Sequence, residues 1–195
     1  MTKFTAALAL TVAAGSLSAC MTTEPAGMDQ SAMADQTVMV GGAAMYPNRN
    51  IIQNAVNSQD HKTLVAAVQA AGLVDTLQGA GPFTVFAPTD SAFATLPAGT
   101  VETLVRPENK AMLTSILTYH VVPGRVTAAD LMAKIRAGGG TARLTTVNGG
   151  VLTARMQGDA VVLVDGKGGT ATVTQADVMQ SNGVIHVTNA VSLPS

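Results

Sequence analysis

The sequence contains no tryptophan, and aromatic residues of all kinds make up 3% of its 195 positions. A folded core must therefore be built from Val, Leu, Ile, Ala and Met. The single cysteine, Cys20, excludes an internal disulfide framework and any multi-cysteine zinc or iron–sulfur site. Charged residues are also scarce, at 12% with a net charge of −1, and Lys and Arg nowhere cluster with aromatics. The composition thus predicts no nucleic-acid partner.

Apolar residues are abundant by contrast, at 47% of the chain. A chain of this length and composition suits one folded domain with short extensions. The first extension has the features of an export signal, because Lys3 supplies a positive charge and Phe4 to Ala19 is uncharged and rich in Ala, Leu and Val. This apolar run is shorter than the roughly 20 residues that a spanning helix needs. We therefore predict a signal peptide over residues 1–19.

The end of this segment, Leu17-Ser18-Ala19-Cys20, resembles the bacterial lipobox. The resemblance implies cleavage before Cys20 and attachment of a diacylglycerol to its thiol. A single acyl chain holds a protein on a membrane only marginally, whereas two or more hold it stably. The next residue is Met21 and not the Asp that signals retention at an inner membrane. We expect a protein that is lipid-anchored outside the cytoplasm, at the outer membrane if the cell has two.

A segment without helical or strand periodicity follows, and we interpret residues 20–46 as a flexible, lipidated tether. Methionines recur through it, at positions 21, 28, 33, 39 and 45. Thioethers can bind Cu(I) or absorb oxidants, which leaves a metal or redox role open as an alternative. No His or Cys beyond Cys20 joins these methionines, so we expect a spacer with no metal site and no cofactor.

The rest of the chain changes from helical to strand periodicity. Apolar residues three or four positions apart predict helices in the first part, one of them capped by Asp60 and another by Thr89 or Asp90. Residues 83–87 interrupt them as a strand that is apolar on both faces, which is typical of a central strand. A later helix is capped by Thr127, with Asp130 three residues after the cap. Further strands are expected at 119–122, 144–147, 151–155, 161–164, 170–174 and 184–187, with a type I′ turn at 148–149. This order predicts an α+β domain.

Three segments together resemble signature blocks of the fasciclin domain family. They read GPFTVFAPTDSAF at 81–93, YHVVPG at 119–124 and NGVIHVTNAV at 182–191. Their order and spacing also match, and the resemblance covers residues 47–193. It implies a twisted β-sandwich or wedge with flanking helices, mostly from the N-terminal half. It also implies adhesion or matrix roles outside the cell, with no common catalytic activity.

The resemblance also suggests where a partner binds. In animal members the Tyr-His region is linked to receptor binding, and Tyr119 and His120 match it. Asp177-Val178-Met179 resembles the segment by which animal members are thought to bind integrins, although Val178 replaces the usual Ile. Each site has a simpler interpretation as well. His120 can be a buried histidine bonded to backbone or to the Thr89-Asp90 corner, and Asp177 can stand at the start of a helix or turn.

The remaining histidines and motif residues are expected to be structural. His186 alternates with apolar strand residues, and Thr89 and Asp90 cap the helix after the central strand. His61 is expected at an exposed helix start. An enzyme would need an acid–base pair around His120, for which the sequence offers only Asp90. We therefore predict a non-catalytic adhesion module with an unknown protein or glycan partner. The alternative is a carrier that binds an apolar ligand, a lipid or pigment, between sheet and helices.

Overall fold

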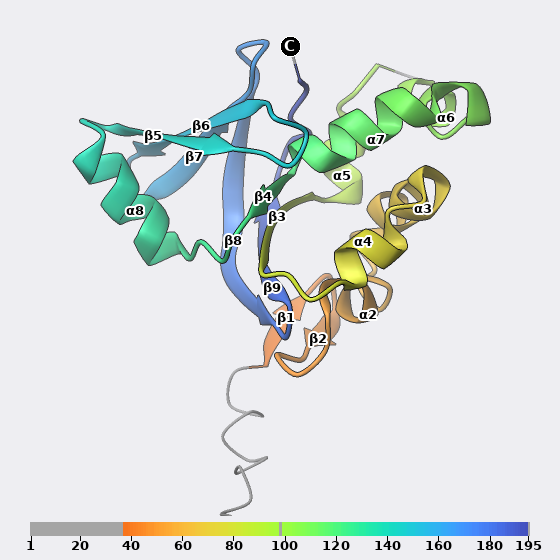
Figure 1. The fold of residues 1–195 in the computed structure, drawn as a ribbon, viewed down its shortest axis with the longest axis horizontal. Helices are drawn as coiled ribbons and strands as arrows, with labels where there is room; N and C mark the ends of the chain where they lie inside the picture. The colour runs from red at the N-terminus through yellow and green to blue at the C-terminus, as the bar shows by residue number, and fades with distance from the viewer. Residues whose placement is uncertain (1–36, 98, 195) are drawn as a thin grey trace, which may run out of the picture.

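The computed structural model describes residues 37–97 and 99–194. In this part the chain forms a seven-stranded sheet flanked by helices and a separate two-stranded hairpin (Figure 1). The predicted α+β class is therefore confirmed. The signal peptide expected over residues 1–19, the lipidation site Cys20 and most of the tether lie outside the described residues.

The large sheet joins strands that are far apart in the sequence, in the order β4-β3-β9-β8-β7-β6-β5. β3 and β9 are parallel, and the other neighbours are antiparallel. The N–H of Val147 donates to the carbonyl of Val121 at 2.8 Å, which links the two edges into a nearly closed barrel. The strands are β3 (Phe83–Pro88), β4 (Val121–Pro123), β5 (Thr141–Thr145), β6 (Val151–Gln157), β7 (Ala160–Val164), β8 (Thr170–Gln180) and β9 (Gly183–Thr188).

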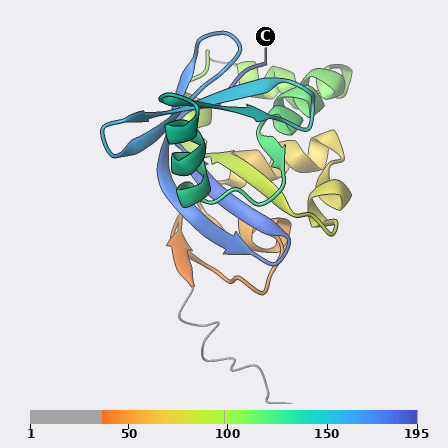
Figure 2. The ribbon, with the colours of Figure 1, turned by 60° about the vertical axis from the view of Figure 1, so that its left-hand side comes forward.

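Most helices lie on one side of this sheet. They are α2 (Ile51–Ala55), α3 (Lys62–Ala71), α4 (Val74–Gln78), α5 (Asp90–Ala94), α6 (Thr100–Leu104), the 3-10 turn η1 (Pro107–Asn109) and α7 (Lys110–Tyr119). α8 (Ala128–Ala137) packs separately against β5 and β6, as Figures 1 and 2 show. The expectation that helices come mainly from the first half is confirmed, with α8 as the exception.

Two apolar clusters fill the domain, one on each face of β3. Val85 and Ala87 belong to the cluster under α2–α7, and Phe86 belongs to the cluster that α8 covers. This placement follows from the alternation of side chains along a strand. It confirms the prediction that residues 83–87 form a central strand.

The expected tether is too long, because part of it is a hairpin. β1 (Val38–Val40) and β2 (Ala43–Met45) pair through Gly41 and Gly42, which have φ of 56° and 73° as a type I′ turn requires. Val40 and Met45 are buried in the cluster under the helices. The folded domain therefore begins near residue 38 and not at 47.

Several local predictions also need correction. Tyr119 is the last residue of α7, so the strand expected at 119–122 begins only at Val121. Residues 148–149 do not form a type I′ turn, because Asp177 is the one described non-glycine residue with positive φ. The strand expected at 170–174 runs on to Gln180. Its continuation was hidden because irregularities between Val173 and Val178 break the two-residue period.

The helix caps are partly as expected. Thr127 and Asp130 form a reciprocal capping box at α8, and Thr89 caps α5. Asp60 does not cap α3, contrary to prediction. The side chain of Asp90 accepts hydrogen bonds from the N–H groups of Lys62 and Thr63, at 3.3 and 2.8 Å. The cap of α3 thus comes from a residue on α5.

Candidate functional site

Tyr119 of the Tyr-His motif lies inside the domain, with 1% of its surface exposed. Its hydroxyl donates to the carbonyl of Val151 on β6 at 2.7 Å and accepts from the N–H of Gly166 at 3.0 Å. Burial raises the pKa of Tyr119, so this hydroxyl stays protonated. Its ring lies against Gly150, where an added Cβ would come within 2.7 Å of Cε2. Tyr119 therefore joins α7 to the far strands of the barrel.

His120 is also buried and makes two hydrogen bonds to backbone. Nδ1 lies 2.8 Å from the carbonyl of Ile116, and Nε2 accepts from the N–H of Ser192 at 3.0 Å. This arrangement requires a neutral imidazole with its proton on Nδ1. Burial is the main cause that lowers the pKa of His120, which agrees with that state. The adjacent Leu193 N–H donates to Asp165 at 2.8 Å, so the C-terminal segment is fastened at two successive residues.

His186 and Asp177 form a second network. Asp177 has φ of 58° in the irregular part of β8, and its N–H donates to Nδ1 of His186 at 3.3 Å. Nε2 of His186 lies 2.8 Å from the carbonyl of Val126, and its ring stacks on Phe86 at 5.5 Å between centroids. Burial lowers the pKa of His186, so the ring is neutral. The expected strand position of His186 is confirmed.

The carboxylate of Asp177 contacts α8 and does not start a helix or turn of its own. Its Oδ1 accepts from the N–H of Ala128, the first residue of α8, at 2.7 Å. Val178 is buried in the core, whereas Asp177 and Met179 are partly exposed. Of the three residues in the expected partner-binding segment, only these two present surface to a partner.

The acid–base pair that an enzyme would need is not formed. Both ring nitrogens of His120 are used by Ile116 and Ser192, and the carboxylate of Asp90 is used by α3. Of the two alternatives for a buried His120, the structure has the bonds to backbone and not the contact with the Thr89-Asp90 corner. Among the described residues, no group of three or more His, Cys, Asp or Glu side chains is placed to hold a metal ion.

Comparison with known proteins decides the family. The model of the family described as "Fasciclin domain" matches residues 59–194. The chain belongs to the fasciclin domain family. It is 46% identical over 173 residues to Protein sll1483 of Synechocystis, covering 86% of this chain and 89% of that protein.

Two other comparisons extend the relationship. The cell surface glycolipoprotein MPB83 of Mycobacterium bovis is 32% identical over 155 residues, which cover 62% of this chain and 69% of that one. The solved FAS1 domain pair from the insect cell adhesion molecule fasciclin I superposes with a TM-score of 0.66 at 18% identity. That match covers 80% of this chain and 57% of the pair, and it shows the shared fold.

The fasciclin domain also contains polar residues whose roles sequence reasoning missed. Asn182 begins the third of the fasciclin blocks, and its side chain accepts from Ile51 N–H at 3.0 Å and donates to the carbonyls of Leu77 and Gly79. Buried Asn54 donates to the side chain of Gln180. Asn182 and Asn54 bond to residues that lie far away in the sequence, so no local sequence pattern predicts these contacts.

His61 departs most from expectation, because it is buried and not solvated. It is 3% exposed, and its Nδ1 lies 2.8 Å from the hydroxyl of Ser58. The helix start was identified correctly, but the hairpin β1–β2 that was mistaken for tether covers it. Its Nε2 has no hydrogen-bond partner within the described residues.

Proposed function

We propose that this chain is a lipid-anchored protein of the cell envelope whose fasciclin domain binds a protein or glycan partner without catalysis. The observation that carries the proposal is that the polar side chains of the fasciclin blocks hold the fold together. Tyr119, His120 and His186 all bond to backbone groups from inside the domain. Side chains committed in this way rigidify a scaffold, and a rigid scaffold favours display of surface residues.

The anchor is supported from two directions. Residues 17–20 resemble a lipobox, and the similar protein MPB83 is named a cell surface glycolipoprotein. No helix in the described ranges is long and apolar enough to cross a membrane. A diacylglycerol on Cys20 would supply stable attachment, because each buried CH₂ contributes about 0.8 kcal/mol.

For the partner surface we propose the irregular part of β8, around Asp177 and Met179. Both side chains are partly exposed, and the hydrogen bond to Ala128 uses Oδ1 of Asp177. The other oxygen can face a cation or a hydrogen-bond donor on a partner. Tyr119 and His120 contribute indirectly, since they are buried and support the fold. The similar fasciclin I pair comes from a cell adhesion molecule.

The anchor is tested by intact mass measurement of the full-length protein extracted from cell membranes. We expect a chain that begins at Cys20 and carries the mass of a diacylglycerol. Cys20→Ser should lose that mass, whereas the neighbouring Met21→Ser should keep it. An unmodified Cys20 in the exported wild-type protein would overturn the proposal of a lipid anchor.

A further inference from the structure

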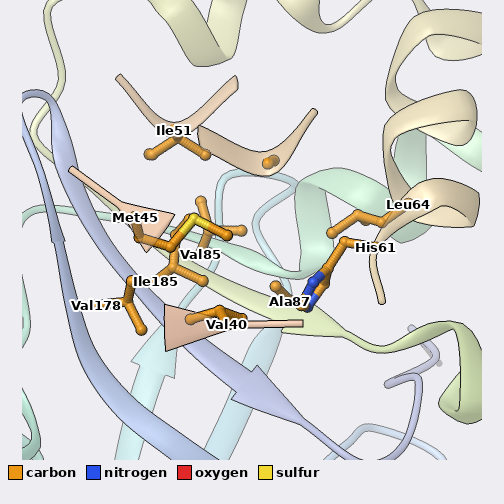
Figure 3. A pocket seen from close by; sticks show the side chains of 10 residues that line it. Val40, Met45, Ile51, His61, Leu64, Val85, Ala87, Val178 and Ile185 are labelled. Atoms are coloured by element: carbon orange, nitrogen blue, oxygen red, sulfur yellow. The ribbon is translucent and has the colours of Figure 1, made fainter. Parts of the chain in front are cut away.

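A small apolar cavity lies between the hairpin β1–β2, the first helices and the sheet (Figure 3). Val40 and Met45 cover it from the hairpin, and Val85 and Ile185 form its floor on β3 and β9. Its volume is about 30 Å³. A second cavity of about 30 Å³ adjoins it and shares four lining residues, Ile51, Ala55, Leu64 and Val85.

His61 is the one polar side chain that lines the first cavity. Figure 3 shows its imidazole reaching from the start of α3 toward Ala87 and Val40. Nδ1 is bonded to Ser58, whereas Nε2 lies near the Ala87 carbonyl without reaching hydrogen-bonding geometry to any described atom. A buried polar atom without a hydrogen-bond partner destabilises the folded state, so a group that bonds to Nε2 would bind favourably.

Water fits this cavity poorly even though the space is sufficient. One water needs about 10–15 Å³ of such space, but it also needs two to four polar partners. The lining provides one polar side chain, His61, and the Ala87 carbonyl beside it, and the remaining side chains are apolar. An apolar molecule with one hydrogen-bonding group matches both the lining and the free nitrogen.

The cover of the cavity pairs with no strand of the large sheet. β1 and β2 form their own two-stranded sheet, so lifting the hairpin breaks no ladder hydrogen bond of the seven-stranded sheet. The hairpin is tied to the segment between α2 and α3 by the bond of Gln59 N–H to Gly41 O at 3.1 Å and by the longer contact of Ser58 Oγ with Val40 O at 3.4 Å. It is tied to β8 by one side-chain bond, from Nε2 of Gln175 to Met39 O at 3.1 Å, which must also break when the hairpin lifts. Such a cover can open locally without unfolding the domain.

We propose that the cavity under the hairpin is a binding site for a slender apolar chain that ends in a hydroxyl group. The hydroxyl bonds to Nε2 of His61, and the chain extends between Ile51, Leu64 and Val85 into the adjoining cavity. A hydroxyl suits either tautomer of His61, because it both donates and accepts. The ligand enters when the hairpin lifts, and the site enlarges as it fills. This role is independent of the partner surface on β8.

In the test, 1-octanol is the probe and is titrated into the full-length mature protein. Binding is followed by the NMR signals of the methyl groups and of the imidazole rings. We expect saturable one-to-one binding, with shifts at the methyl groups of Val40 and Met45 and at the ring nitrogens of His61. Ala55→Leu places extra carbons where the two cavities meet and should weaken binding at least tenfold. Val56→Leu is the matched control, because Val56 is 51% exposed, and its affinity should stay within twofold of wild type.

His61→Leu removes the polar anchor and should weaken 1-octanol binding by roughly two- to tenfold, the range expected for one hydrogen bond. If this variant does not fold, the pair Ala55→Leu and Val56→Leu still decides the question. A response that does not saturate, or equal affinities for wild type and folded Ala55→Leu, would overturn the proposal.

Discussion

The hydroxyl of Tyr119, at the end of α7, donates to the carbonyl of Val151 on β6 across 2.7 Å. The same oxygen accepts from Gly166 in the turn between β7 and β8. One atom thus links a helix to two parts of the barrel. Loss of this atom should loosen the domain and leave its apolar core intact.

Tyr119→Phe removes only that oxygen, and we expect it to lower the free energy of unfolding by about 1–3 kcal/mol, because two hydrogen bonds to backbone groups are lost. Urea denaturation measures the effect. Tyr46→Phe is the matched control, since Tyr46 is 40% exposed, and it should change stability by less than about 0.5 kcal/mol. Equal effects of the two substitutions would contradict the role assigned to Tyr119.

Stability should fall as the pH drops below 6.5. Burial lowers the pKa of His61, His120 and His186 below their ordinary value of 6.5. The unfolded chain therefore binds protons first as the pH falls through 6.5, and unfolding is favoured until each folded-state pKa is reached. The contribution of the neutral histidines to stability is fully present above pH 6.5. Below pH 6.5, each histidine that is still neutral in the folded state lowers the free energy of unfolding by about 1.4 kcal/mol per pH unit.

Urea denaturation at pH 8, 7, 6 and 5 measures this slope. For His61 the negative charges of Asp90 and Asp60 partly oppose the effect of burial, so its folded-state pKa is lowered less than burial alone would lower it. The pH range over which His61 contributes to the slope therefore ends at a higher pH. His61→Leu should reduce the number of protons taken up on unfolding by about one. A free energy of unfolding that stays constant from pH 7 to pH 5 would show that these histidines are not buried in their neutral form.

Asp90→Ala should cost about 1–2 kcal/mol, although Asp90 is outside the helix that it caps. Its carboxylate satisfies the first N–H groups of α3, and caps of this kind contribute about that much. Thermal unfolding followed by circular dichroism would measure the loss. Asp159→Ala, at an exposed turn, is the comparison and should leave the midpoint nearly unchanged.

This cap shows what sequence reasoning can and cannot reach. Thr127 and Asp130 were predicted as a cap because they stand three residues apart, and the structure contains that capping box. Asp90 and Thr63 are 27 positions apart, so only the fold brings them together. Asp60 is much nearer to α3 in the sequence, so local spacing favours it although it does not cap the helix.

The same limit applies to the candidate sites. The Tyr-His motif was recognised by its residues, but their neighbours Val151 and Ser192 come from distant segments. The hairpin β1–β2 was missed because each of its strands has three residues, too few to show a two-residue period. Since the hairpin was missed, the burial of His61 beneath it was missed as well.

Asp177→Asn should separate a structural role from a binding role. Asn keeps an oxygen that can accept from Ala128 and tolerates the positive φ at this position, so the free energy of unfolding should change by less than about 1 kcal/mol. The carboxylate charge is lost, and binding of a partner through that charge should be lost with it. If Asp177→Asn were strongly destabilised, the carboxylate charge would be needed for stability of the fold and not for binding of a partner.

The most direct test of the proposed interaction module is cross-linking in living cells, with tagged full-length wild type compared with Asp177→Asn and Asp159→Asn. We expect wild type and Asp159→Asn to capture the same recurrent protein or glycan, and Asp177→Asn to capture much less of it at equal abundance in the envelope. Identical captured material from all three would contradict a partner surface on β8.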